Sequence, residues 1–134
     1  MADRHTSGVL DTSTYIDLGV LAPEVLPEVP EITAITLAEL HHGVAAARDA
    51  ASYMARTQQL AAAIVEFEPL PFDRQTATRY GTLIALTLDV GRDPRSRRLD
   101  LMIAATASCH GLPLYTRNAK DFVGLESLVE VVEV

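Results

Sequence analysis

Short apolar runs alternate along the chain with longer segments in which apolar residues recur every three or four positions. The short runs predict strands over residues 7–11, 31–35, 68–70, 113–116 and 128–134. The longer segments predict helices over residues 12–21, 36–47, 49–67, 73–88 and 97–109, with a helical turn at 118–122. Strands that alternate with helices predict an α/β sandwich, in which helices flank a mostly parallel central sheet.

Local signals support several of these boundaries. Asp73 is placed to cap the helix that follows it, and Gly111 is placed to end the helix before it. The segment 91–96 predicts a basic loop. An amphipathic helix over residues 49–67 is indicated by side chains at helical spacing: Tyr53, Thr57, Leu60 and Ile64.

Four acidic residues lie inside or directly beside apolar runs: Asp11, Glu39, Asp100 and Asp121. A buried carboxylate without a partner is heavily penalised, so such groups are usually paired, hydrogen-bonded or bound to a metal ion. In open parallel sheets, ligands bind beyond the carboxyl ends of the strands, where Asp11 and Thr116 are placed. Glu39 and Asp100 fall near the starts of helices that can point into the same crevice.

Each acid also has an ordinary structural explanation. Asp11 can cap the following helix, and Glu39 can reach back to the amide of Thr36 in a capping box. Asp100 lies in the first turn of its helix, where the helix dipole favours an anion. The segment Asn118–Asp121 resembles another helix start. Taken together, the four acids favour a site for Mg²⁺ or Mn²⁺, because these hard cations prefer carboxylate oxygens. Such an ion can activate a bound water and offset charge on a phosphate.

Composition fits one globular domain spanning residues 1–134, with 49% hydrophobic and 22% charged residues. No apolar run approaches the ~20 residues that a membrane helix needs. The start of the chain, Met1 to Ser7, is polar, and no signal-peptide core follows it. The single cysteine, Cys109, excludes an intrachain disulfide and a multi-cysteine zinc site. We therefore expect a cytoplasmic protein that does not enter membranes.

The net charge of −7 argues against broad, nonspecific binding of nucleic acid, but the basic residues are clustered. A basic strip beside an acidic centre is what a phosphodiester substrate requires, although a solvated loop is the alternative explanation. The candidates for phosphate contacts are Arg92, Arg95, Arg97, Arg98 and Arg117.

Four segments in this order resemble the signature segments of one known family: Val9–Ser13, Thr36–Leu40, Leu99–Ala107 and Leu114–Phe122. They are similar to those of PIN-domain ribonucleases and, more narrowly, of VapC toxins of bacterial type II toxin–antitoxin modules. The resemblance covers almost the whole chain, and it implies a PIN-like three-layer sandwich.

The resemblance also implies an activity, a cofactor and partners. It implies a Mg²⁺- or Mn²⁺-dependent endoribonuclease that hydrolyses phosphodiester bonds in structured RNA, such as tRNA or ribosomal RNA. It implies a VapB-type antitoxin that neutralises the enzyme, and a homodimer. The implied metal ligands are Asp11, Glu39, Asp100 and Asp121, with Ser13, Thr116 and Asn118 in support. Asn118 stands where many relatives carry Asp, so we expect a second metal ion to bind weakly or only together with the substrate.

Other interpretations stay open at this point. A DNA-directed nuclease of the same fold is the nearer rival, and a Mg²⁺-binding receiver domain is a remote one. His41 and His42 are neighbours on a helix and do not face the same way, so we expect a polar helix face rather than a metal chelate. The Ala-rich segment 45–63 is either a groove for an antitoxin helix or a part of the core.

Overall fold

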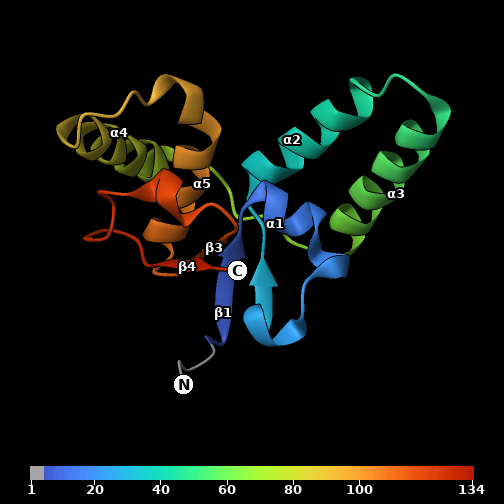
Figure 1. The fold of residues 1–134 in the computed structure, drawn as a ribbon, viewed down its shortest axis with the longest axis horizontal. Helices are drawn as coiled ribbons and strands as arrows, with labels where there is room; N and C mark the ends of the chain where they lie inside the picture. The colour runs from blue at the N-terminus through green and yellow to red at the C-terminus, as the bar shows by residue number, and fades with distance from the viewer. Residues whose placement is uncertain (1–4) are drawn as a thin grey trace.

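The structure, a computed structural model, describes residues 5–134. The polar leader expected from the sequence falls largely on residues 1–4 and so lies outside the described residues. The centre of the fold is a four-stranded sheet in the order β2-β1-β3-β4, and each neighbouring pair is parallel (Figure 1). Its strands are β1 (Ser7–Leu10), β2 (Val29–Glu31), β3 (Leu114–Thr116) and β4 (Val131–Glu133).

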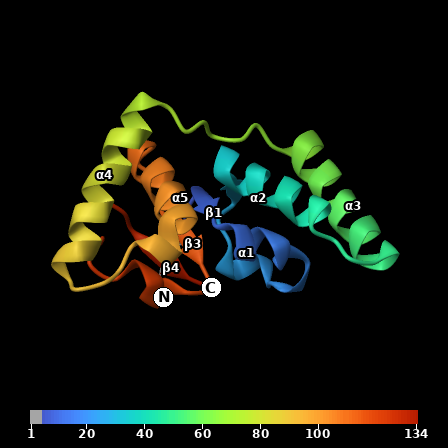
Figure 2. The same cartoon turned by 90° about the horizontal axis from the view of Figure 1, so that it is seen from above.

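Helices cover both faces of this sheet, which confirms the expected α/β sandwich. The helices are α1 (Thr12–Ile16), α2 (Ala34–Ala45), α3 (Ala50–Glu66), α4 (Arg74–Asp89) and α5 (Arg98–Cys109). Short 3-10 turns are η1 (Leu18–Val20), η2 (Pro23–Val25), η3 (Arg95–Arg97) and η4 (Ala119–Phe122). The pair α4 and α5 lies on one side, and α1, α2 and α3 lie on the other (Figure 2).

Alternation along the strands explains the two layers of core. Val9 and Leu114 point to one face of the sheet, where they pack against α4 and α5. Leu10 and Tyr115, the next residues along each strand, belong to the core under α1, α2 and α3. Each fully buried aliphatic side chain contributes about 1.5–3 kcal/mol, so both faces are held firmly.

Helix ends follow the expected chemistry at two positions. The side chain of Asp73 accepts a hydrogen bond of 2.9 Å from the amide of Thr76 and so caps α4. This bond also lowers the pKa of the Asp73 carboxyl. Gly111 follows α5 with a φ of +64°, a left-handed conformation that glycine adopts without strain.

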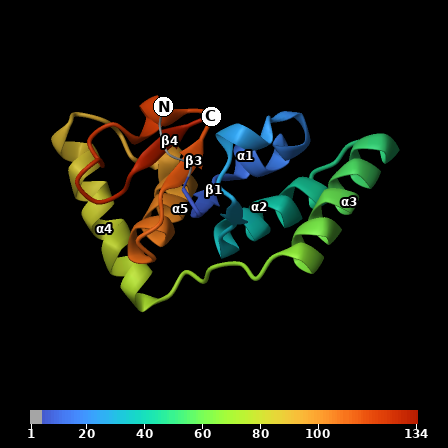
Figure 3. The ribbon, with the colours of Figure 1, turned by 90° about the horizontal axis from the view of Figure 1, so that it is seen from below.

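Several predicted boundaries were wrong, and each has a local cause. Thr33 accepts a hydrogen bond of 3.2 Å from the amide of Thr36, so α2 begins at Ala34 and the strand before it ends at Glu31. The predicted strand 68–70 is a single bridge between Leu70 and Thr33. The connection between α3 and α4 passes from one helical layer to the other (Figure 3), and on the way Leu70 exchanges backbone hydrogen bonds with Ile32 and Ala34. The first helix and the last strand are also shorter than expected.

Helix α3 forms as expected, but of the four side chains predicted at helical spacing only Leu60 is buried. Its buried side chains are Leu60 and Ala63, whereas Tyr53 and Ile64 are 55% and 54% exposed. The helix therefore packs on the body through few residues.

Within residues 5–134, no helix combines the length and the hydrophobicity that crossing a bilayer requires.

Candidate active site

Asp11 lies at the carboxyl end of the central strand β1 and is only 4% exposed. One of its oxygens, Oδ2, accepts a hydrogen bond of 2.6 Å from the hydroxyl of Thr116 at the end of β3. The other, Oδ1, accepts a bond of 3.0 Å from the amide of Thr14 and so caps α1. The helix cap and the place at the strand end are therefore two roles of one carboxylate.

Ser13 and Asn118 stand around this carboxylate in supporting positions. The Ser13 hydroxyl donates a long hydrogen bond of 3.4 Å to Oδ1 of Asp11. The backbone amide of Asn118 donates a bond of 3.0 Å to the Thr116 hydroxyl and so fixes the turn after β3. Thr116 thus links the Asn118 turn to Asp11.

Glu39 reaches the site from the second turn of α2 and is held there by hydroxyl groups. The Thr12 hydroxyl donates a hydrogen bond of 2.7 Å to Oε1 of Glu39, and it lies 3.0 Å from the Thr36 hydroxyl. Because Thr12 has one proton to give, Thr36 must donate to Thr12. The alternative explanation of Glu39 as a capping-box residue was wrong, because Thr33 is the N-cap.

The roles of Thr12 and Thr36 were not predicted from the sequence. Thr12 follows Asp11 directly, and Thr36 lies three positions before Glu39, so both neighbour predicted ligands. The usable signal was this run of hydroxyls next to acids at a strand end.

Asp100, in the first turn of α5, is half-buried and receives no hydrogen bond or ion pair from residues 5–134. Burial and, after it, the charges of the other three acids raise the pKa of its carboxyl to about 6, although the charge of Arg97 partly opposes them. Repulsion of this kind needs short separations. The structure therefore brings together the four acids predicted from the sequence, which we call the acidic cluster: Asp11, Glu39, Asp100 and Asp121.

Arg97 forms an ion pair with Asp121 and introduces a positive charge into the acidic cluster. The two side chains come from η3 and η4, and they are 27% and 25% exposed. Partial burial strengthens such a pair relative to a surface pair. Of the arginines in residues 5–134, Arg97 is the one paired with a member of the cluster.

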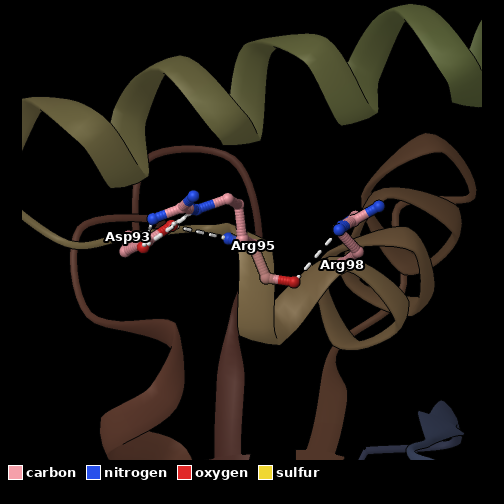
Figure 4. Close-up of polar contacts among 3 residues, drawn as sticks. All are labelled: Asp93, Arg95 and Arg98. Atoms are coloured by element: carbon pink, nitrogen blue, oxygen red, sulfur yellow. Dashed lines mark hydrogen bonds and ion pairs between the residues drawn. The ribbon is translucent and has the colours of Figure 1, made fainter.

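The remaining candidate arginines lie around the cluster and are anchored elsewhere. Arg95 pairs with Asp93, whose pKa this contact lowers to about 2, and Arg98 donates to the Arg95 carbonyl at 3.2 Å (Figure 4). Arg92 donates to the carbonyl of Lys120 at 2.6 Å. Arg117 pairs with Asp17 at 2.5 Å.

A hollow of about 420 Å³ opens beside the acidic cluster. It is lined by Glu39, Arg95, Ser96, Arg98, Leu99 and Asp100. Two arginines therefore share one hollow with two carboxylates, and an anionic ligand placed there meets both charges. Arg92 and Arg117 are not among the residues that line it.

The donor set suits a hard divalent cation, because it consists of carboxylate oxygens with free lone pairs. Asp100 fits this best, since no hydrogen bond from residues 5–134 reaches it and the charges of three acids repel it. In residues 5–134, no three His, Cys, Asp or Glu side chains are already arranged as a metal site. Thr12 contacts Oε1 of Glu39 and Arg97 contacts Oδ1 of Asp121, so the second oxygen of each carboxylate is available to a cation.

The chain is similar to known proteins along most of its length. Residues 9–125 match the model of the PIN domain family. The chain is 37% identical to Ribonuclease VapC5 of Mycobacterium tuberculosis (strain ATCC 25618 / H37Rv) over an alignment of 141 positions that covers all of both proteins.

Two solved structures extend the similarity to three dimensions. One is the crystal structure of VapBC-5 from Mycobacterium tuberculosis, a member of the VapBC family of toxin–antitoxin systems. It superposes with a TM-score of 0.81 and 33% identity, over 96% of this chain and 99% of that one. The other is DNA-bound VapBC from Salmonella typhimurium, with a TM-score of 0.72 and 25% identity, over 96% and 98% of the two chains.

Proposed function

The chain belongs to the PIN-domain family, and from this we propose that it is a divalent-metal-dependent endoribonuclease, the VapC-type toxin of a type II toxin–antitoxin module. The observation that carries the proposal is the environment of the Asp100 carboxyl. This carboxyl is half-buried near three other acids, its pKa is raised to about 6 although Arg97 partly opposes the rise, and no hydrogen bond from residues 5–134 reaches it. A protein keeps such a cluster at a cost in stability, which a bound cation offsets.

The acidic cluster would hold the cation. We assign Asp11, Glu39 and Asp100 to a first ion, and Asp121 with Asn118 to a second ion that arrives with the RNA. When bound, a divalent ion lowers the pKa of a coordinated water and offsets the negative charge that develops on the phosphate.

The other residues of the site orient these ligands and the substrate. Thr116 and the Thr14 amide fix both oxygens of Asp11, and the Thr12 hydroxyl fixes Glu39. Arg95 and Arg98 line the same hollow as Asp100, and we propose that they contact the phosphates on either side of the cut bond. Such contacts position the RNA without reading its sequence.

We further propose a VapB-type antitoxin and a second copy of this chain as partners, and one domain over the whole chain. The similar solved structures named above are VapBC complexes. For the antitoxin we retain the segment 45–63 as the docking place. Its residues Tyr53 and Met54 are 55% and 62% exposed, and only Leu60 and Ala63 of this segment are buried. A crosslinking map of the complex that places the antitoxin elsewhere would remove this assignment.

The activity is tested by incubating the purified protein with total bacterial RNA, with Mg²⁺ or Mn²⁺ and with a chelator, followed by mapping of the new RNA ends. We expect discrete cuts that require the metal and are lost in Asp11→Asn and Asp100→Asn, while circular dichroism shows an unchanged fold. Retained cleavage in either variant contradicts the assignment. Cleavage of DNA in preference to RNA would favour the rival nuclease.

The toxin role is tested in cells. Expression of the chain should arrest growth, and co-expression of the small gene beside it should restore growth. Expression of Asp100→Asn is the matched control and should leave growth unaffected. Arrest that persists with this variant would separate toxicity from cleavage and contradict the proposal.

A further inference from the structure

A second hollow continues from the first one along α2. It has a volume of about 470 Å³ and is lined by Ile35, Ala38, Glu39, His42 and Leu99. The two hollows share Glu39 and Leu99. The two hollows therefore adjoin at these residues, and we call the pair the groove, which reaches from the arginines past Asp100 and Glu39 to His42.

The two halves of this groove differ in chemistry. The half at Arg95 and Arg98 is charged, whereas the half at His42 combines three apolar side chains and one imidazole with the carboxylate of Glu39 at its border to the first hollow. Leu99 is 48% exposed although its neighbour Asp100 belongs to the acidic cluster. A nucleotide combines the same two kinds of surface, because it joins a charged phosphate to a base that has apolar faces.

We propose that this second hollow receives a nucleobase next to the cleaved bond, and we call it the base pocket (Ile35, Ala38, His42 and Leu99). The proposal rests on the ribonuclease function proposed above and names a substrate contact of that site. Ile35, Ala38 and His42 are spaced by three and four residues on α2, so they share one helix face. Leu99 closes the pocket from α5. In this arrangement the His42 imidazole stacks on the base, as aromatic side chains do in recognition of unpaired RNA.

His41 provides a matched control within the same helix. It is exposed like His42, but it faces another direction and is not among the residues that line either hollow. If α2 presents only a solvated polar face, as expected from the sequence, replacing either histidine should have the same effect on cleavage. If His42 lines a base pocket, only its replacement should lower cleavage.

An antitoxin side chain is the rival occupant, since an apolar hollow also suits a protein segment. The position of the hollow favours the base. It opens directly onto Glu39, and the opposite end of the same groove carries guanidinium groups that suit RNA phosphates. A nucleotide chain laid along this groove places phosphates at the arginines and a base at His42.

The test begins with the cut site that the wild-type protein makes in total RNA. Oligonucleotides of that sequence are then made with an abasic nucleotide at each position around the cut. We expect one abasic position to lower kcat/KM of the wild-type protein by about 5- to 100-fold, the range that stacking of one base on an aromatic residue provides. His42→Ala should lose as much on the intact substrate and lose nothing more at that abasic position. His41→Ala should behave as the wild type.

A second variant addresses the pocket without removing a polar group. Ala38→Phe fills the hollow from an exposed position, so the fold should survive, as a thermal unfolding curve would show. We expect this variant to show the same loss and the same insensitivity to the abasic position. Its thermal stabilisation by Mn²⁺ should match that of the wild type, because no ligand has changed.

Three results would overturn the inference. His42→Ala cleaving as well as His41→Ala would do so, and so would tolerance of an abasic nucleotide at every position. Loss of neutralisation by the antitoxin in His42→Ala, with unchanged cleavage, would assign the hollow to the protein partner. A wild-type protein that cuts no RNA is a different outcome, since it removes the ribonuclease function and the base pocket with it.

Discussion

Thr116 donates a hydrogen bond of 2.6 Å to Asp11, across 105 positions of sequence. The parallel pairing of β1 and β3 places the two residues at the same edge of the sheet. The bond is charge-assisted and buried, and the Thr116 oxygen in turn accepts from the Asn118 amide. One hydroxyl group therefore connects the central acid of the site to the turn that follows β3.

Replacing Thr116 by Val should loosen Asp11 without changing the shape of the core. We expect a loss of about 1.5–3 kcal/mol in the free energy of unfolding, as for hydrogen bonds to charged groups. Metal affinity or cleavage should fall by about 10- to 100-fold, the usual cost of losing a partner of a metal ligand. Urea unfolding and Mn²⁺ titration by calorimetry measure the two effects.

Thr87→Val is the control for Thr116→Val. Thr87 is also buried, but its hydroxyl donates to the Leu83 carbonyl within α4 at 2.8 Å. This variant should leave Mn²⁺ affinity unchanged. Equal losses of affinity in both variants would show that Thr116 acts only through general stability.

The positions of the acids could be predicted from the sequence because they follow from the geometry of parallel sheets. Asp11 ends a strand, and carboxyl ends of parallel strands meet at one edge. The partner of Glu39 could not be predicted in this way. Whether Thr12 or Ser13 turns toward Glu39 depends on how α1 leaves the strand, and both residues carry the same chemical group.

The packing of α3 shows a second limit. Periodicity identifies an apolar stripe, but it does not say whether the stripe meets the core or a partner protein. Tyr53 and Ile64 are exposed because α3 contacts the body through Leu60 and Ala63. The isolated bridge at Leu70 has a similar cause, since the tertiary position of the chain decides whether a short apolar run pairs along its length.

The Arg97–Asp121 ion pair should compete with cation binding. Arg97→Gln removes the guanidinium that partly neutralises the acidic cluster. The metal-free protein should therefore become less stable, because repulsion among the carboxylates increases. Its melting temperature should then rise more on addition of Mn²⁺ than that of the wild type. Differential scanning fluorimetry with and without a chelator measures both shifts.

Arg95→Gln is the matched control for Arg97→Gln. Arg95 pairs with Asp93 on the surface, outside the acidic cluster. Arg95→Gln should leave the Mn²⁺-induced rise in melting temperature as in the wild type. A smaller shift in Arg97→Gln than in Arg95→Gln would mean that Arg97 supports the bound cation instead of competing with it.

Gly8 is required by the close approach of Tyr115 to β1. A Cβ atom at position 8 would lie 2.5 Å from a carbon of the Tyr115 ring, and both residues are buried. Gly8→Ala should therefore destabilise the fold by about 1–3 kcal/mol through overpacking.

Gly81→Ala is the control for Gly8→Ala, since a Cβ atom at position 81 on α4 meets nothing within 4 Å. It should stabilise the helix by about 0.5–1 kcal/mol in urea unfolding. Equal effects of the two substitutions would contradict the close contact.

The raised pKa of Asp100 predicts a stability that falls as pH rises. The folded protein holds the proton up to a pKa of about 6, whereas the unfolded chain releases it near the ordinary value of 3.8. Stability is therefore lost between these two values, and the whole penalty is present above them. Asp100→Asn removes the ionisation and should unfold at higher urea than the wild type at about pH 8 in chelator, by about 1–2 kcal/mol after allowance for solvent screening. The gain should vanish at about pH 4, where the wild-type carboxyl is neutral in the folded state.

Asp93→Asn should give no gain in stability at about pH 8, which makes it the control for this measurement. Hydrogen bonds from Arg95 lower the pKa of Asp93 to about 2, so its charge stabilises the folded state above the ordinary carboxyl pKa. Asp93→Asn should therefore leave stability unchanged or slightly reduced at about pH 8. An Asp100→Asn protein that is less stable than the wild type at that pH, without metal, would show that Asp100 is a favourable structural anion. The acidic cluster would then need no cation to explain it.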